Sequence, residues 1–89
     1  MTQLTLEIVN EKGLHARASA KLVEVVEAFD ASAEISKDGL SASGDSIMGL
    51  LMLAASKGSF IDIETAGADA DALAGAIRTL VADKFGEDA

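Results

Sequence analysis

Two stretches of the chain, one at its N-terminus and one about two-thirds of the way along, alternate apolar and polar side chains with a period of two residues. They cover residues 1–9 and 60–64. The alternating apolar positions are Leu4, Leu6 and Ile8 in the first, where Val9 breaks the pattern, and Ile61 and Ile63 in the second, which Phe60 precedes. This period predicts strands with one buried face and one face in water. The chain must therefore build a sheet that needs a cover on only one side.

Three other stretches place apolar residues at helical spacing. The first helix begins at Ala16, the second runs from Ile47 to about Ala55, and the third follows "AGADAD" at 66–71. The stripes comprise Ala18, Leu22, Val25, Val26 and Phe29 in the first, Ile47, Leu50 and Ala54 in the second, and Ala70, Leu73, Ile77, Leu80 and Val81 in the third. Three such helices can cover the remaining face of a sheet.

A hairpin is expected between the first and second helices. "KDG" at 37–39 separates two short strands, 33–36 and 40–43, and Asp-Gly is a strong signal for a two-residue hairpin turn. The predicted order of elements is therefore β-α-β-β-α-β-α. This order corresponds to a two-layer α+β sandwich.

Length, charge and cysteine content limit the possible functions. The 89 residues suffice for a single domain, 1–89, and the absence of cysteine excludes disulfides, thiolate catalysis and Cys-ligated zinc. A net charge of −8 disfavours nucleic acid and anionic membranes as partners. No basic segment precedes an apolar one at the N-terminus, and no apolar run could span a bilayer. We therefore expect a cytoplasmic protein without a signal peptide or membrane insertion.

The only histidine, His15, lies in "GLHARASA" at residues 13–20, at the predicted start of a helix. Free amide groups and the positive end of the helix dipole make such a position an anion site. Arg17 adds a planar set of donors suited to phosphate. These positive surroundings favour a neutral imidazole, which is a nucleophile. The alternative is an ordinary surface histidine, because "HxR" alone is a weak motif.

A second motif, "GDSIMGLLML" at 44–53, places Ser46 at the expected N-cap of the short helix. The helix is apolar nearly all round, so some of its side chains must be exposed. Exposed apolar residues in a cluster suggest a docking surface, for which Ile47, Met48, Leu51 and Met52 are the candidates. The alternatives are a purely structural cap and a deeper core.

"GLHARASA" and "GDSIMGLLMLAASKG" together resemble the two hallmark segments of the HPr family. These are the histidine-containing phosphocarriers of the bacterial phosphoenolpyruvate-dependent phosphotransferase system. The two motifs occur at the family's usual places, and the resemblance covers essentially the whole chain. It implies an open-faced sandwich, in which three helices cover one face of a four-stranded antiparallel sheet.

The resemblance also implies a role for each matching residue. His15 would accept a phosphoryl group on Nδ1 from enzyme I and pass it to an enzyme IIA, with Arg17 stabilising the phosphate. Ser46 would match the serine that a dedicated kinase/phosphorylase modifies in some bacteria. The protein would be a monomeric relay in sugar uptake or nitrogen regulation, without a metal or cofactor, and not itself an enzyme.

Two residues depart from the family pattern. Ala18 stands where many members have proline, which would preset the first helical turn, and Asp45 stands where a basic residue is common. "DSIMGLLML" also resembles the serine motif of acyl carrier proteins, in which Ser46 would carry phosphopantetheine. Acyl carriers are helical bundles, so a β-sheet would discriminate between the two alternatives.

Overall fold

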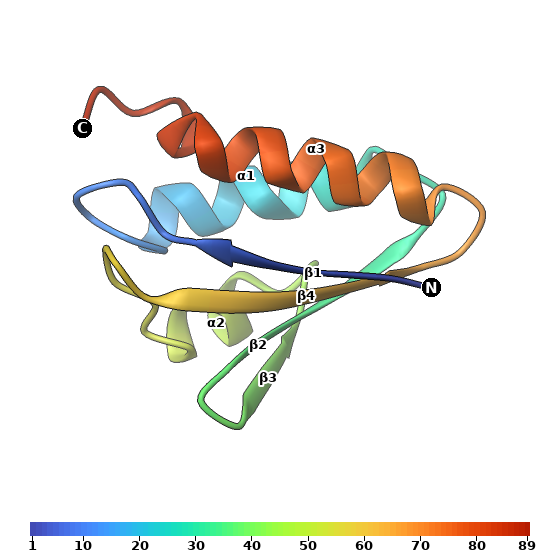
Figure 1. Cartoon of the computed structure of the whole chain (residues 1–89), viewed down its shortest axis with the longest axis horizontal. Coiled ribbons are helices and arrows are strands. Elements are labelled where there is room, and N and C mark those ends of the chain that lie inside the picture. The colour runs from blue at the N-terminus through green and yellow to red at the C-terminus, as the bar shows by residue number, and fades with distance from the viewer.

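A four-stranded antiparallel sheet forms one layer of the protein, and helices form the other (Figure 1). The computed structural model describes all residues, 1–89. The strands are β1 (Thr2–Glu7), β2 (Ser32–Lys37), β3 (Leu40–Ser43) and β4 (Phe60–Ala66), in the spatial order β1-β4-β2-β3. The helices are α1 (Ala16–Glu27), α2 (Ile47–Met52), α3 (Ala70–Ala82) and a 3-10 turn, η1 (Lys84–Gly86). The predicted α+β sandwich is therefore confirmed.

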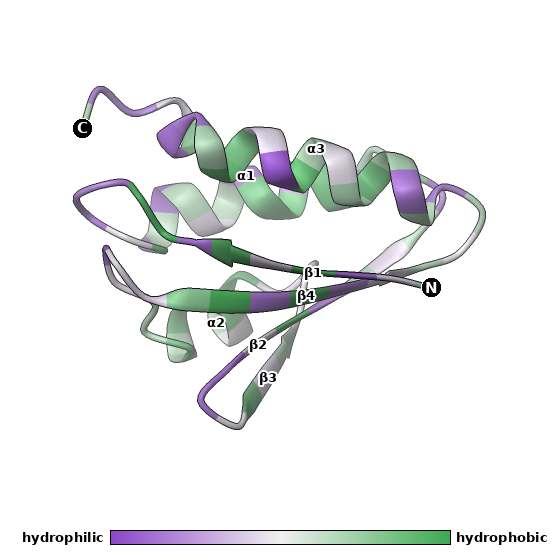
Figure 2. Ribbon diagram, viewed as in Figure 1, coloured by the Kyte–Doolittle hydropathy of each residue, from purple (hydrophilic) through white to green (hydrophobic).

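The core lies between the sheet and the helices, and the strand register explains which side chains enter it. Leu4 pairs with Ile63, Ile63 with Ile35, and Ile35 with Ala42, so one row of apolar side chains crosses all four strands. Leu22 of α1, Leu50 of α2 and Ile77 of α3, all fully buried, belong to the same core cluster. Hydrophobic residues accordingly alternate with hydrophilic ones along the strands in Figure 2.

The hairpin between β2 and β3 has the turn that its sequence predicts. Lys37 pairs with Leu40, which leaves Asp38 and Gly39 as the two loop residues. Both have positive φ angles, 51° and 85°, as the twist of a two-residue hairpin favours.

The second helix is shorter than predicted. It ends at Met52 and not near Ala55, because Leu53 is its C-cap and Ala54 takes a left-handed conformation with a φ of 52°. The predicted stripe is also wrong in part. Leu50 is buried, but Ala54 is exposed beyond the helix end and Ile47 is 39% exposed, while Leu53 is buried in place of Ala54.

The chain after α3 forms a strap, residues 83–89, that the sequence analysis did not anticipate. Lys84, Phe85 and Gly86 all have positive φ angles, so the backbone makes a left-handed turn. Left-handed conformations cost non-glycine residues about 1–2 kcal/mol each. Complete burial of the Phe85 ring offsets this cost, and Lys21 donates a hydrogen bond to the Phe85 carbonyl at 2.7 Å. The strap thereby returns toward the start of α1.

None of the helices has the length and the apolar content needed to cross a membrane.

Candidate functional site

His15 is the N-cap of α1, as the sequence predicted, and the loop before it is held by a close backbone contact. The His15 backbone is extended, and its ring nitrogen Nδ1 accepts a hydrogen bond from the Arg17 amide at 3.3 Å. Gly13 has a φ of 66°, and a Cβ at this position would lie 2.4 Å from the carbonyl oxygen of Ala55. Only glycine therefore allows the loop to approach so closely.

The surroundings of Nδ1 are suited to an anion. The first backbone hydrogen bond of α1 runs from the Ser19 amide to the His15 carbonyl, so the amides of Ala16 and Ala18 have no helix carbonyl to bond. These amides lie at the positive end of the helix dipole. The His15 side chain is 27% exposed, so a partner can reach it.

Arg17 leaves its guanidinium free for an incoming anion. The residue is exposed, and its side chain makes no hydrogen bond or ion pair within the protein. It lines a depression of about 390 Å³ together with Lys12, Lys21 and the strap residues 86–89. An exposed arginine without a partner can turn its donors toward a phosphate held next to the helix terminus.

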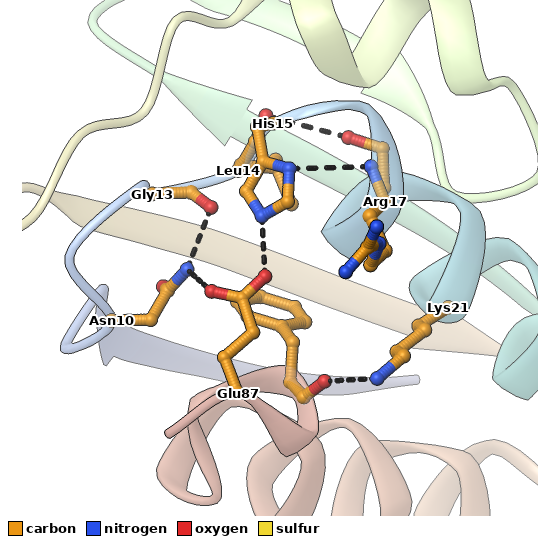
Figure 3. A network of polar contacts seen from close by, with 9 residues as sticks. Asn10, Gly13, Leu14, His15, Arg17, Lys21 and Glu87 are labelled. Atoms are coloured by element: carbon orange, nitrogen blue, oxygen red, sulfur yellow. Dashed lines mark hydrogen bonds and ion pairs between the residues drawn. The ribbon is translucent and has the colours of Figure 1, made fainter. Parts of the chain in front are cut away.

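Glu87 is a member of the site that the sequence analysis missed. Its Oε2 contacts His15 Nε2, and its Oε1 accepts a hydrogen bond from Asn10 Nδ2 at 2.9 Å (Figure 3). Asn10 Nδ2 also donates to the Gly13 carbonyl at 2.8 Å. No local sequence signal could have found this contact, because Glu87 is 72 residues from His15.

The charge state of Glu87 follows from these contacts. The hydrogen bond from Asn10, followed by the hydrogen bond and charge of His15 and the charge of Lys12, holds the pKa of Glu87 below its ordinary value of 4.5. Burial acts in the opposite direction, but the hydrogen bonds and charges outweigh it. A carboxylate therefore faces His15 at neutral pH. The sequence predicts only positive surroundings for the imidazole, and Glu87 adds a negative charge to them.

Ser46 and α2 form the second part of the site. Ser46 is the N-cap of α2, and its Oγ accepts a hydrogen bond from the Gly49 amide at 3.1 Å, as predicted. The apolar surface contains Met48 and Met52, which are 71% and 74% exposed, with Ile47 beside them. Leu51 is only partly exposed.

The two motifs are brought together by helix packing and by one hydrogen bond. Helix α2 packs against α1. The Leu14 amide donates to the Ala55 carbonyl at 2.8 Å, which links the loop before His15 to the segment after α2. No group of three or more histidine, aspartate or glutamate side chains is arranged to hold a metal ion.

Comparison with known proteins identifies the family. The family described as "PTS HPr component phosphorylation site" matches residues 2–83. The phosphocarrier protein HPr of Neisseria meningitidis is 42% identical over 87 residues, 98% of each chain, and NPr of Escherichia coli K12 is 38% identical over 85 residues, 94% of each. A crystal structure of HPr from Thermoanaerobacter tengcongensis matches with a TM-score of 0.94 at 34% identity over the full length of both chains.

A second crystal structure from the same organism, described as an HPr dimer, matches with a TM-score of 0.77 and covers 98% of this chain. Sequence and fold thus agree, and the chain belongs to the HPr family of phosphocarrier proteins.

Proposed function

We propose that the chain carries a phosphoryl group on Nδ1 of His15, receives it from phosphorylated enzyme I and passes it to an enzyme IIA. The observation that carries this proposal is the position of Nδ1 at the start of α1. There it accepts a hydrogen bond from the Arg17 amide, so it carries a lone pair and no proton, and release of that hydrogen bond makes the lone pair available to phosphorus. A nitrogen with a lone pair in an anion site can attack phosphorus and then hold the product.

The transfer is a displacement between two imidazoles. The bond from phosphorus to the donor nitrogen breaks as the bond to His15 Nδ1 forms, and the donor imidazole leaves with the electron pair. His15 becomes an N-phosphoimidazolium, whose phosphoryl oxygens can accept hydrogen bonds from the first-turn amides and from the Arg17 guanidinium. Transfer to enzyme IIA is the same displacement in the opposite sense.

The protein acts in this scheme as a relay and not as an enzyme, because it is modified in each transfer and restored by the next one. We assign partner docking to the α2 surface formed by Ile47, Met48, Leu51 and Met52. Exposed methionines support this role, since their flexible side chains adapt to partners of different shape. A relay that serves at least two partners needs such a surface.

Ser46 is assigned a regulatory role beside its structural one. It caps α2 at the edge of the docking surface, where a serine kinase would add a charge of about −1.5 to −2. Asp45 already places a carboxylate there, and Ser43 donates a hydrogen bond to it at 2.6 Å. The four-stranded sheet argues against the acyl-carrier alternative, in which Ser46 would carry the prosthetic group of a helical bundle.

The test is incubation of the protein with enzyme I and phosphoenolpyruvate, followed by measurement of the intact mass. We expect the gain of one acid-labile phosphoryl group in the wild type and in Ser46→Ala, and no gain in His15→Ala. A gain that persists in His15→Ala, or no gain in the wild type, would overturn the proposal. Sedimentation at the concentration used for the assay checks the proposed monomer.

A further inference from the structure

Glu87 contacts the nitrogen of His15 that does not receive the phosphoryl group in the proposed function, on which the following inference rests. One ring nitrogen, Nδ1, accepts from the Arg17 amide, and the other, Nε2, faces the Glu87 carboxylate. A carboxylate accepts hydrogen bonds and does not donate them, so the imidazole proton belongs on Nε2. The hydrogen bond made by one nitrogen of an imidazole determines the state of the other.

We infer that Glu87 is a positioning residue for His15: it holds the proton on Nε2 and thereby keeps Nδ1 as the nucleophilic nitrogen. A carboxylate that orients a histidine in this way is common among hydrolases, where the wrong tautomer is nearly inactive. After transfer, the same carboxylate faces the proton of the N-phosphoimidazolium. Glu87 does not touch the phosphoryl group and acts through His15 alone.

Asn10 determines the orientation of the carboxylate. The Asn10 side chain is fully buried, and its two amide hydrogens go to the Gly13 carbonyl and to Glu87 Oε1. The opposite orientation of this amide would direct its oxygen at two acceptors. The amide keeps its orientation although its Oδ1 has no partner within the protein. Asn10 therefore requires an acceptor at the position of Glu87 Oε1.

The strap delivers Glu87 to this position. Its left-handed turn at residues 84–86, the buried Phe85 ring and the hydrogen bond from Lys21 hold the segment directly before Glu87. The Glu87 side chain is only 15% exposed, in contrast to the exposed Asp88 that follows it. The buried turn thus fixes the backbone before Glu87, and the hydrogen bond from Asn10 fixes its carboxylate.

These contacts predict that two substitutions of Glu87 shift the tautomer of His15 to different extents. In Glu87→Ala the acceptor is lost, and the imidazole should become a mixture of its two tautomers. In Glu87→Gln the Asn10 donor should hold the new amide by its oxygen, so that the amide nitrogen donates to His15 Nε2. That arrangement favours a proton on Nδ1 and opposes the Arg17 amide, which donates to Nδ1 in the wild type, so Glu87→Gln should shift the tautomer further toward Nδ1 than Glu87→Ala.

The experiment is a long-range ¹H–¹⁵N correlation spectrum of the unphosphorylated protein, recorded at a pH where the imidazole is neutral. In the wild type we expect the ¹⁵N shift of a protonated nitrogen for Nε2 and that of an unprotonated nitrogen for Nδ1. The control is Asp83→Asn, which removes an exposed carboxylate from the same strap, away from the depression that Arg17 lines, and should leave both shifts unchanged. A wild-type spectrum with the proton on Nδ1, or unchanged shifts in both Glu87 variants, would overturn the inference.

The rate of phosphorylation by enzyme I gives the second readout. We expect a slowing on the order of tenfold in Glu87→Ala, a larger one in Glu87→Gln, and none in Asp83→Asn. Equal rates in all variants would contradict the positioning role. The NMR spectrum needs no partner, so a failure of enzyme I to phosphorylate the wild type would refute the proposed function without changing the tautomer result. If Glu87→Ala does not fold, Glu87→Gln, which keeps the size of the side chain, decides the tautomer.

Discussion

The Leu14 amide donates a hydrogen bond to the Ala55 carbonyl at 2.8 Å, and this bond joins the loop that carries His15 to the segment that follows α2. The contact requires Gly13, because a Cβ at that position would lie 2.4 Å from the same carbonyl oxygen. The proposed phosphoryl acceptor, His15, and the proposed docking helix are thus held together by backbone atoms. A partner that binds α2 meets His15 at a defined position.

Substitution of Gly13 by alanine should be costly for two reasons. The positive φ of 66° costs an alanine about 1–2 kcal/mol, and the clash with Ala55 adds to this. We expect Gly13→Ala to lower the free energy of unfolding in urea by about 2 kcal/mol or more. The control is Gly58→Ala, since Gly58 has a φ of 89° but open space around it. Equal losses in the two variants would show that the contact with Ala55 contributes nothing.

Arg17→Lys keeps the charge at the site but loses the planar set of donors. Because the Arg17 side chain is exposed and has no partner within the protein, we expect no change in melting temperature. Phosphoryl transfer in rapid-quench experiments should slow by about tenfold or more in both directions, since donors aimed at developing charge have large effects. Unchanged rates with both enzyme I and enzyme IIA would make Arg17 a bystander.

Ser46→Asp should keep the stability of the domain and slow the phosphorylation of His15. A carboxylate at the N-cap can accept the Gly49 hydrogen bond and interacts favourably with the helix terminus, so melting should show at least wild-type stability. Phosphorylation of His15 by enzyme I should slow, because a partner that docks on α2 would have to desolvate the added charge. Because Asp45 already places one carboxylate beside Ser46, the added charge should slow phosphorylation less than it would next to a basic residue.

The control for this prediction is Ser46→Ala, which should lose about 1 kcal/mol of stability with the cap and keep its phosphorylation rate. A Ser46→Asp protein that is less stable than the wild type but retains the full rate would show that Ser46 is a cap and nothing more.

Glu87 should make stability depend on pH in the acid range. Its pKa is lowered in the folded protein, so its contribution is present above the unfolded value, near 4.5, and is lost as the pH falls through the lower folded value. The difference in unfolding free energy between the wild type and Glu87→Gln should therefore shrink when urea titrations are moved from pH 7 to below about 4.

Asn10 is the largest cause of the lowered pKa of Glu87. Asn10→Ala should therefore remove more of this pH dependence than His15→Ala. A difference that grows on acidification would mean that the pKa of Glu87 is raised on folding.

Most of the fold could be predicted because its signals are local. The alternation at Leu4 and Leu6, the helical stripe after Ala16 and the Asp38-Gly39 turn each depend on neighbouring residues, and the structure confirms all three. The caps at His15 and Ser46 could be read in the same way, from polar residues at helix starts.

The parts that could not be predicted depend on backbone conformations without a sequence signal. Ala54 and Phe85 both adopt left-handed conformations that normally indicate glycine, so neither the early end of α2 nor the strap was apparent. Glu87 could not be assigned to the site for the same reason. Its contact with His15 exists only because the turn at residues 84–86 reverses the chain.

The central claim is that Nδ1 of His15 carries the phosphoryl group while Nε2 keeps its proton toward Glu87. The most direct test is NMR of the ¹⁵N-labelled protein after phosphorylation by enzyme I, with the ¹⁵N–³¹P coupling used to identify the modified nitrogen. We predict coupling to Nδ1 of His15 and a protonated Nε2 in the same molecule. Coupling to Nε2, or a phosphorus signal that arises from Ser46 and leaves both nitrogens of His15 unmodified, would contradict this account.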